Sequence, residues 1–121
     1  MRILIVVIVV SALCLTGGYF SLTGDCSNKI KLEAKSPDGK YVATWFVRDC
    51  GATTDFSTIV NLRDISTRFD GDQLGVFIVE GQPQVSIVWQ GARHLRIECQ
   101  NCNQENIYRQ DKSWKEVNVS Y

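Results

Sequence analysis

Apolar and polar side chains alternate along most of the chain beyond residue 25. Residues 29–35 read KIKLEAK, and this strict alternation predicts a half-buried strand with three apolar side chains on one face, namely Ile30, Leu32 and Ala34. Residues 40–48 (KYVATWFVR) are apolar on both faces and rich in β-branched and aromatic types, which is typical of a central strand covered on both sides. The SPDG sequence of residues 36–39 predicts a turn between the two strands.

Six further segments have the same short, strand-like character, and Gly, Pro, Asn or Asp separates most of them. They cover residues 56–65, 74–79, 85–89, 94–99, 106–109 and 115–121. Beyond residue 22 no window has the i, i+3, i+4 apolar spacing of a helix. Short connections favour antiparallel neighbours, so we expect an all-β fold of about eight strands, a single small antiparallel meander that forms a sandwich-like or strongly curled sheet.

The N-terminal segment has a different pattern. Residues 3–15 (ILIVVIVVSALCL) are almost entirely apolar, and no charged residue falls between Arg2 and Asp25. A helix needs about 20 residues to cross a bilayer. Residues 3–22 are therefore long enough to form an N-terminal hydrophobic helix that spans a membrane.

Two fates fit this segment, a retained anchor and a cleaved signal peptide. Tyr19 and Phe20 lie where the interfacial aromatic belt of an anchor would lie, and no good A-x-A cleavage site is present. We therefore favour the anchor and keep cleavage as the alternative. The chain then divides into residues 1–24, an anchor or signal peptide, and residues 25–121, a disulfide-stabilised extracytoplasmic β domain.

The first charged residue suggests a location. Arg2 with no accompanying acid favours a cytoplasmic N-terminus. We expect a single-pass protein of a bacterial inner membrane, with its C-terminal domain in the periplasm or outside the cell. After signal cleavage the protein would instead be secreted or periplasmic. These compartments are oxidising and allow disulfides to persist.

Composition excludes some classes of function. The 121 residues include 13 basic side chains, 13 acidic side chains and one His. A net charge of zero offers no basic excess for nucleic acid, and one imidazole cannot build a multi-histidine centre. We expect no nucleic-acid partner, no cofactor and no metal. The expected partners are the membrane, through residues 3–22, and an envelope protein.

Four of the five cysteines lie in the expected domain. Cys14 falls inside the apolar segment, and the other four allow three pairings between which sequence alone cannot choose. Proximity favours a bond between Cys99 and Cys102. Cys26 and Cys50 then remain, and they flank the first hairpin, whose two ends lie side by side.

The CQNC run of residues 99–102 has two other interpretations. A redox-active dithiol usually lies at a helix N-terminus, where the helix dipole lowers the thiol pKa, and a zinc site would need all four thiols reduced. Here the pair ends a predicted strand, and the polar residues 103–106 (NQEN) follow it. A structural disulfide is therefore favoured, with the redox and zinc interpretations left open.

The segment DCGATTD, residues 49–55, is the least ordinary loop of the chain. Its hydroxyl-bearing and acidic side chains are candidates for contact with a ligand or partner, namely Asp49, Thr53, Thr54 and Asp55. The same residue types also stabilise turns, so a purely structural role is the alternative.

Two other polar features receive structural interpretations. His94 lies on the polar face of its predicted strand, and no motif places a nucleophile with it, which indicates a surface residue. The DGD sequence of residues 70–72 is similar to the start of a calcium loop. The QLG sequence of residues 73–75 follows where further ligands belong, so we expect a plain turn.

Two resemblances can be stated. The SPDGKY sequence of residues 36–41, together with the later strand at residues 85–89 and the LRI of residues 95–97, resembles one blade of a TolB-type β-propeller. Residues 26–63, with their SPDGK…RDCGATT…FST core, resemble a family of small bacterial envelope proteins that carry an N-terminal hydrophobic segment followed by a Cys, and the rest of the chain resembles it only loosely. The family has no established activity, so the resemblance implies no catalytic residue. It does imply an envelope location and a Cys26–Cys50 pairing.

These observations favour a non-enzymatic binding or structural module of the bacterial envelope. The first alternative is a thiol–disulfide redox protein that uses Cys99 and Cys102. The second is an envelope inhibitor or immunity-type protein that blocks another protein with a sheet edge or with the 49–55 loop. No residue is predicted to be catalytic.

Overall fold

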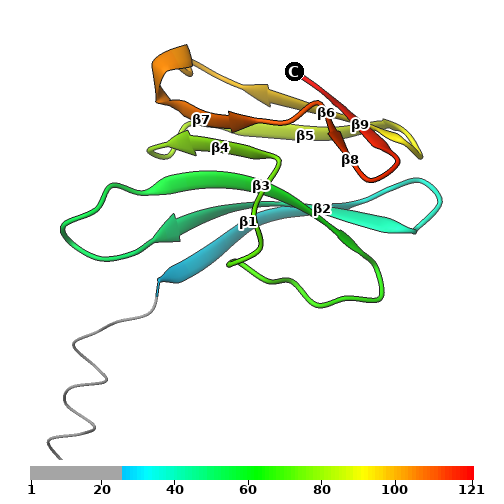
Figure 1. The fold of residues 1–121 in the computed structure, drawn as a ribbon, viewed down its shortest axis with the longest axis horizontal. Helices are drawn as coiled ribbons and strands as arrows, with labels where there is room; N and C mark the ends of the chain where they lie inside the picture. The colour runs from blue at the N-terminus through cyan, green and yellow to red at the C-terminus, as the bar shows by residue number, and fades with distance from the viewer. Residues whose placement is uncertain (1–25) are drawn as a thin grey trace, which may run out of the picture.

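The computed structural model describes residues 26–121. In this part of the chain two β-sheets face each other (Figure 1), and the only helical element is η1 (Gln104–Asn106), a single turn of 3-10 helix. The all-β, sandwich-like fold predicted from the alternation is therefore confirmed. The hydrophobic helix expected at residues 3–22 lies outside the described residues.

The strands divide unequally between the two sheets. The first sheet has five antiparallel strands in the order β1-β2-β3-β4-β7, and the second has four in the order β5-β6-β9-β8. Their bounds are β1 (Ser27–Lys35), β2 (Tyr41–Asp49), β3 (Ser57–Asp64), β4 (Phe77–Glu80), β5 (Val85–Gly91), β6 (His94–Cys99), β7 (Ile107–Gln110), β8 (Ser113–Trp114) and β9 (Val117–Ser120).

The main core lies between the sheets. Strand β5 buries Val85 and Ile87 and exposes Ser86 and Val88, as its alternation predicts. Strands β2, β3, β4, β6 and β9 contribute inward-facing apolar side chains to the same cluster. These are Tyr41, Ala43, Val60, Leu62, Phe77, Val79, Leu95, Ile97, Val117 and Val119. Removing this apolar surface from water is the main favourable term in holding the layers together.

The expectation of a single antiparallel meander is wrong. After β4 the chain leaves the first sheet and builds the β5–β6 hairpin in the second, and β7 then returns to pair with β4. Strand β9 lies parallel to β6, with Leu95 opposite Val119. Alternation reports which face of a strand is buried, but it does not report which strand becomes the neighbour. The two-residue strand β8 is also too short to show a pattern.

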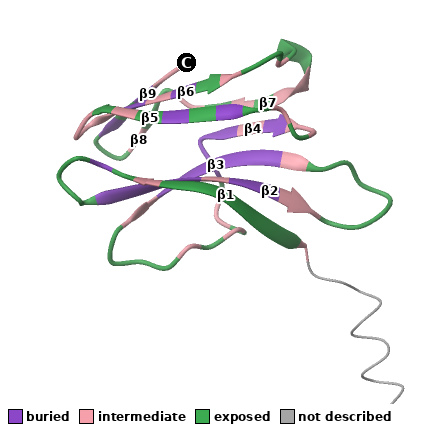
Figure 2. Cartoon of the chain, turned by 180° about the vertical axis from the view of Figure 1, so that it is seen from behind, coloured by how far each residue is buried: buried purple, intermediate pink, exposed green. Residues whose placement is uncertain are grey.

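Strand β1 differs from the half-buried strand predicted for residues 29–35. A β-bulge shifts its register, so Ile30 lies opposite Phe46 while Leu32 lies opposite Trp45, the residue just before Phe46 in β2. The two apolar side chains therefore point to opposite faces, and each is 45% exposed. Strand β1 forms the edge of its sheet and is exposed along most of its length (Figure 2).

Residues 65–76, which we call the strap, connect β3 to β4 across the face of the first sheet that points away from the second sheet (Figure 1). Phe69 of the strap packs edge-on against Phe46 of β2, with ring centroids 5.0 Å apart. The strap explains why residues 40–48 are apolar on both faces, because both faces of β2 are covered. The strand expected at 74–79 begins only at Phe77, and Leu74 is 61% exposed on the strap.

Candidate functional site

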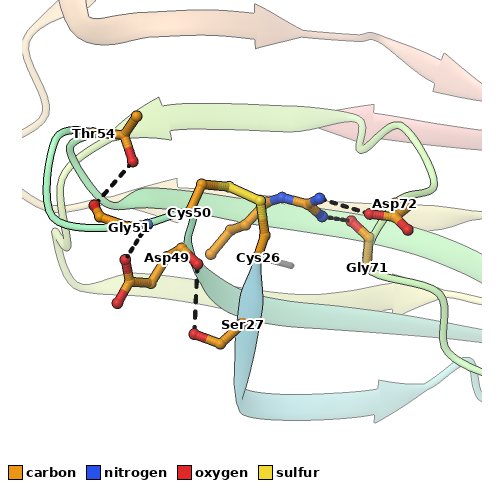
Figure 3. The surroundings of a disulfide bond; sticks show 9 residues. Cys26, Ser27, Asp49, Cys50, Gly51, Thr54, Gly71 and Asp72 are labelled. Atoms are coloured by element: carbon orange, nitrogen blue, oxygen red, sulfur yellow. Dashed lines mark hydrogen bonds and ion pairs between the residues drawn. A yellow bond between two sulfur atoms is a disulfide. The ribbon is translucent and has the colours of Figure 1, made fainter. Parts of the chain in front are cut away.

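The Cys26–Cys50 disulfide closes the end of the β1–β2 hairpin (Figure 3). Cys26 precedes β1 and Cys50 follows β2, and their Cα atoms are 4.0 Å apart. The adjacent residues Ser27 and Asp49 pair across the two strands, so the strand register brings the cysteines together. The Cys26–Cys50 pairing favoured from the sequence is therefore present.

Two of the four candidate residues in the 49–55 loop stabilise the loop itself. The Asp49 carboxylate accepts a hydrogen bond from the backbone N–H of Gly51 at 3.0 Å, and the Thr54 hydroxyl donates to the Gly51 carbonyl at 3.1 Å (Figure 3). Gly51 has φ = 121°, a conformation that favours glycine. Asp49 and Thr54 thus both take part in holding the shape of the loop.

The other two candidates, Thr53 and Asp55, are exposed. Within residues 26–121 neither side chain forms a hydrogen bond or an ion pair. The next residue, Phe56, lies just before β3 and is 42% exposed. Thr53, Asp55 and Phe56 are thus among the side chains of this end that a partner can reach.

A surface cavity of about 320 Å³ lies beside this loop. Val47 and Phe56 provide an apolar wall, while Lys29 and Asp49 bring opposite charges to the rim. Its full lining is Ser27, Asn28, Lys29, Val47, Asp49, Phe56 and Gln82. The cavity therefore combines apolar contact surface with polar groups that can orient a bound segment.

The strap is fastened next to the disulfide. The Arg48 guanidinium donates hydrogen bonds to the Gly71 carbonyl and to the Asp72 carboxylate, the latter at 2.6 Å (Figure 3). A hydrogen bond from the Gln73 N–H to the Asp70 carbonyl closes the turn that was expected at residues 70–72. Nowhere in residues 26–121 do three His, Cys, Asp or Glu side chains gather to hold a metal ion.

The second disulfide, Cys99–Cys102, closes the turn that follows β6. Both cysteines pack against the core, and both line an open hollow of about 320 Å³ together with Tyr121. The nearest helical element is the three-residue η1, which is too short to supply a helix dipole to a thiolate. Arg96, another lining residue, is paired with Glu98 at 2.8 Å.

A charged cluster that the sequence did not reveal lies at the opposite end of β1. Asp38 accepts hydrogen bonds from Ser36 at 2.6 Å and from Arg93 at 2.7 Å, and these bonds hold the pKa of the Asp38 carboxyl well below its usual range. Glu116 accepts from Tyr41 and from Lys40, which lowers its pKa to about 2. The cluster joins the β1–β2, β5–β6 and β8–β9 turns.

The cluster was missed because its members are far apart in sequence. Asp38 and Arg93 are separated by 55 residues. Asp38 was the only charged member in a predicted turn, and Glu116 fell within the strand predicted for residues 115–121. His94 is less solvated than expected, because it is partly buried and its Nε2 lies 2.9 Å from the Ser120 hydroxyl oxygen.

Comparison of the chain with protein-family models, with curated proteins and with solved structures finds no match. Within residues 26–121 no helix has the length and apolar character needed to cross a bilayer. The candidate site is the end of the sandwich that the Cys26–Cys50 disulfide closes, together with the exposed 49–55 loop and the adjoining cavity.

Proposed function

We propose that the protein is a non-enzymatic binding module of the bacterial envelope, held to the inner membrane by residues 3–22. In this proposal the end closed by Cys26–Cys50 binds another envelope protein. The observation that carries it is the exposed group Thr53, Asp55 and Phe56 beside a cavity with an apolar wall. Exposed aromatic side chains next to free polar groups are typical of protein contact surfaces.

The chemistry of the titratable groups supports a module rather than an enzyme. The carboxyl groups with lowered pKa values are Asp38 and Glu116, and the largest cause of each shift is a hydrogen bond from a side-chain hydroxyl of the protein. Neither carboxyl group lines the cavity beside the 49–55 loop. Their perturbation thus has a structural cause and need not reflect catalysis.

An inhibitor or immunity-type role would use the same end of the domain. The competing surface is the free edge of β1, which carries Lys29, Lys31 and Lys35 as well as the bulge. Lysines and bulges on an edge strand oppose the addition of another strand. The 49–55 loop is therefore the better candidate for blocking a partner.

Site-specific photo-cross-linking tests the binding proposal. The full chain is produced in bacterial cells with p-benzoylphenylalanine at position 53 or 55, and at position 90 as the matched control. Gln90 is equally exposed but lies near the β5–β6 turn, at the other end of the domain. We expect a discrete adduct from positions 53 and 55 and none from position 90. Equal adducts from all three positions, or none from the loop, would contradict the proposal.

A thiol–disulfide activity is the second candidate, because Cys99 and Cys102 line an open hollow. In such a reaction a partner dithiol would be oxidised to a disulfide, and its two electrons and two protons would convert Cys99–Cys102 to two thiols. Redox titration separates the roles, since structural disulfides have potentials below about −300 mV. A higher potential, together with activity that Cys102→Ser abolishes, would favour the redox protein.

A further inference from the structure

Beneath the strap, three buried polar atoms have no hydrogen-bond partner among residues 26–121. They are Thr44 Oγ1, Asn61 Oδ1 and Arg63 Nε. Thr44 is 0% exposed and Asn61 is 1% exposed. An unsatisfied buried polar group costs about 1–3 kcal/mol, so three of them in one place need an explanation.

The strand register places the three atoms together. Thr44 of β2 lies directly opposite Asn61 of β3, and Arg63 follows Asn61 on the same face. The Arg63 guanidinium reaches Glu33 of β1, with 3.8 Å between Nη2 and Oε1, and Glu33 is the residue paired with Thr44. Because Arg63 itself is paired with Val42, its side chain must cross β2 between Val42 and Thr44.

Two of these three side chains, Asn61 and Arg63, also bond to the strap. Arg63 donates a hydrogen bond to the carbonyl of Thr67, and the Asn61 amide nitrogen donates to the carbonyl of Asp70 at 3.2 Å. Because the Asp70 carbonyl can only accept, this bond fixes the orientation of the Asn61 amide. Asn61 Oδ1 is thereby left as an unpaired acceptor.

The chemistry of the three atoms defines what can bind between them. Arg63 Nε–H can only donate, Asn61 Oδ1 can only accept, and the Thr44 hydroxyl can do either. A cation would be repelled by the Arg63 guanidinium, and an anion by the Asn61 oxygen. The occupant must therefore be small, neutral and able both to donate and to accept.

We propose that the three side chains of Thr44, Asn61 and Arg63 form a binding site for one internal water molecule. The water accepts a hydrogen bond from Arg63 Nε–H, donates to Asn61 Oδ1, and makes its third bond with the Thr44 hydroxyl. Three hydrogen bonds are typical of a buried water that satisfies otherwise unpaired polar groups. The strap then rests on a hydrated polar layer, with Phe69 as its apolar contact.

Wild-type protein provides the first test. In the full chain purified in detergent, water-to-protein nuclear Overhauser effects should connect a long-lived water to the Arg63 Nε–H proton. Oxygen-17 relaxation dispersion should count this water among the slowly exchanging ones. If the Nε–H proton shows no contact with a long-lived water, the proposal is overturned.

Two variants provide the second test. Thr44→Val removes the hydroxyl and keeps the side-chain shape, so the count of long-lived waters should fall by one and the folding equilibrium constant by about tenfold. Thr44→Ser is the matched control, because it keeps the hydroxyl and should keep the water. A folded Thr44→Val protein with an unchanged water count, or with equal or greater stability, contradicts the proposal. If this variant does not fold, the wild-type measurement decides.

Discussion

Arg93, in the turn between β5 and β6, forms an ion pair with Asp38, in the turn between β1 and β2, with 2.7 Å between Nη1 and Oδ2. Arg93 also lies 3.3 Å from Glu116, in the turn between β8 and β9. A single guanidinium thus joins turns of both sheets at the end opposite the Cys26–Cys50 disulfide. The SPDG sequence therefore does more than reverse the chain, because its aspartate connects the two layers.

This cluster predicts a loss of stability in acid. A carboxyl group whose pKa is lower in the folded state stabilises the fold above its unfolded-state pKa and loses that contribution as the pH falls through the folded value. For Glu116 the pKa falls from 4.5 to about 2, so the loss should occur across that interval. Urea unfolding between pH 7 and pH 2.5 measures it.

Charge-neutral variants identify the source of this acid sensitivity. Glu116→Gln should lower stability at pH 7 and flatten the pH dependence below pH 4.5, because the titrating carboxyl group is absent. Glu105→Gln is the matched control, since Glu105 is exposed and forms no ion pair within residues 26–121. If both variants show the same pH profile as the wild type, Glu116 is not the cause of the acid sensitivity.

The two disulfides should differ in their effect on stability. Cys26 and Cys50 are 24 residues apart, whereas Cys99 and Cys102 are 3 apart. On the chain-entropy model the longer closed loop contributes about 3 kcal/mol and the shorter about 2 kcal/mol. We therefore expect Cys26→Ser to lower the melting temperature more than Cys102→Ser.

Denaturation of the two single variants under oxidising conditions measures this difference. Cys50→Ser should match Cys26→Ser, because either change opens the same bond. Non-reducing peptide mapping of the wild type should recover residues 26 and 50 in one linked peptide pair. A link from Cys26 to Cys99 or Cys102 would rule out the observed pairing.

Much of this fold is predictable from the sequence because the informative patterns are local. Alternation identified the buried face of β5, and the hairpin on either side of residues 36–39 suggested which cysteines meet. The change of sheet after β4 left no such local pattern. The parallel pairing of β6 with β9 is set by packing between segments distant along the chain, which periodicity does not record.

The candidate site, like the fold, was predictable only where its contacts are local in sequence. Asp49 and Thr54 act on the neighbouring Gly51, so residue type alone indicated a turn role for them. The bond from Arg48 to Asp72 spans 24 residues and depends on the path of the strap. Strap residues show no periodicity. The only sequence sign that they cover β2 is that residues 40–48 are apolar on both faces.

The membrane anchor is tested by changing its apolar segment. A charged residue near the centre of a spanning helix costs about 2.5–3.5 kcal/mol, so Val10→Asp should reduce membrane insertion. Val10→Ala, which adds no charge, is the control. Carbonate extraction should leave the wild type and Val10→Ala in the membrane pellet, with an N-terminus at Met1. A soluble wild-type protein that begins near Tyr19 would show that the segment is a cleaved signal peptide.

The edge-on contact between Phe46 and Phe69 should couple the strap to the first sheet. Phe46→Leu and Phe69→Leu each keep apolar volume but lose the aromatic contact, and a double-mutant cycle should give a coupling free energy of about 0.5–1.5 kcal/mol. Phe77 is the control partner, because it belongs to the core between the two sheets, whereas Phe46 lies under the strap. Phe46→Leu and Phe77→Leu should therefore be additive within about 0.5 kcal/mol in urea unfolding. Coupling between Phe46 and Phe69 no larger than in this control pair would mean that polar bonds, such as those from Arg48 and Asn61, hold the strap without help from the aromatic contact.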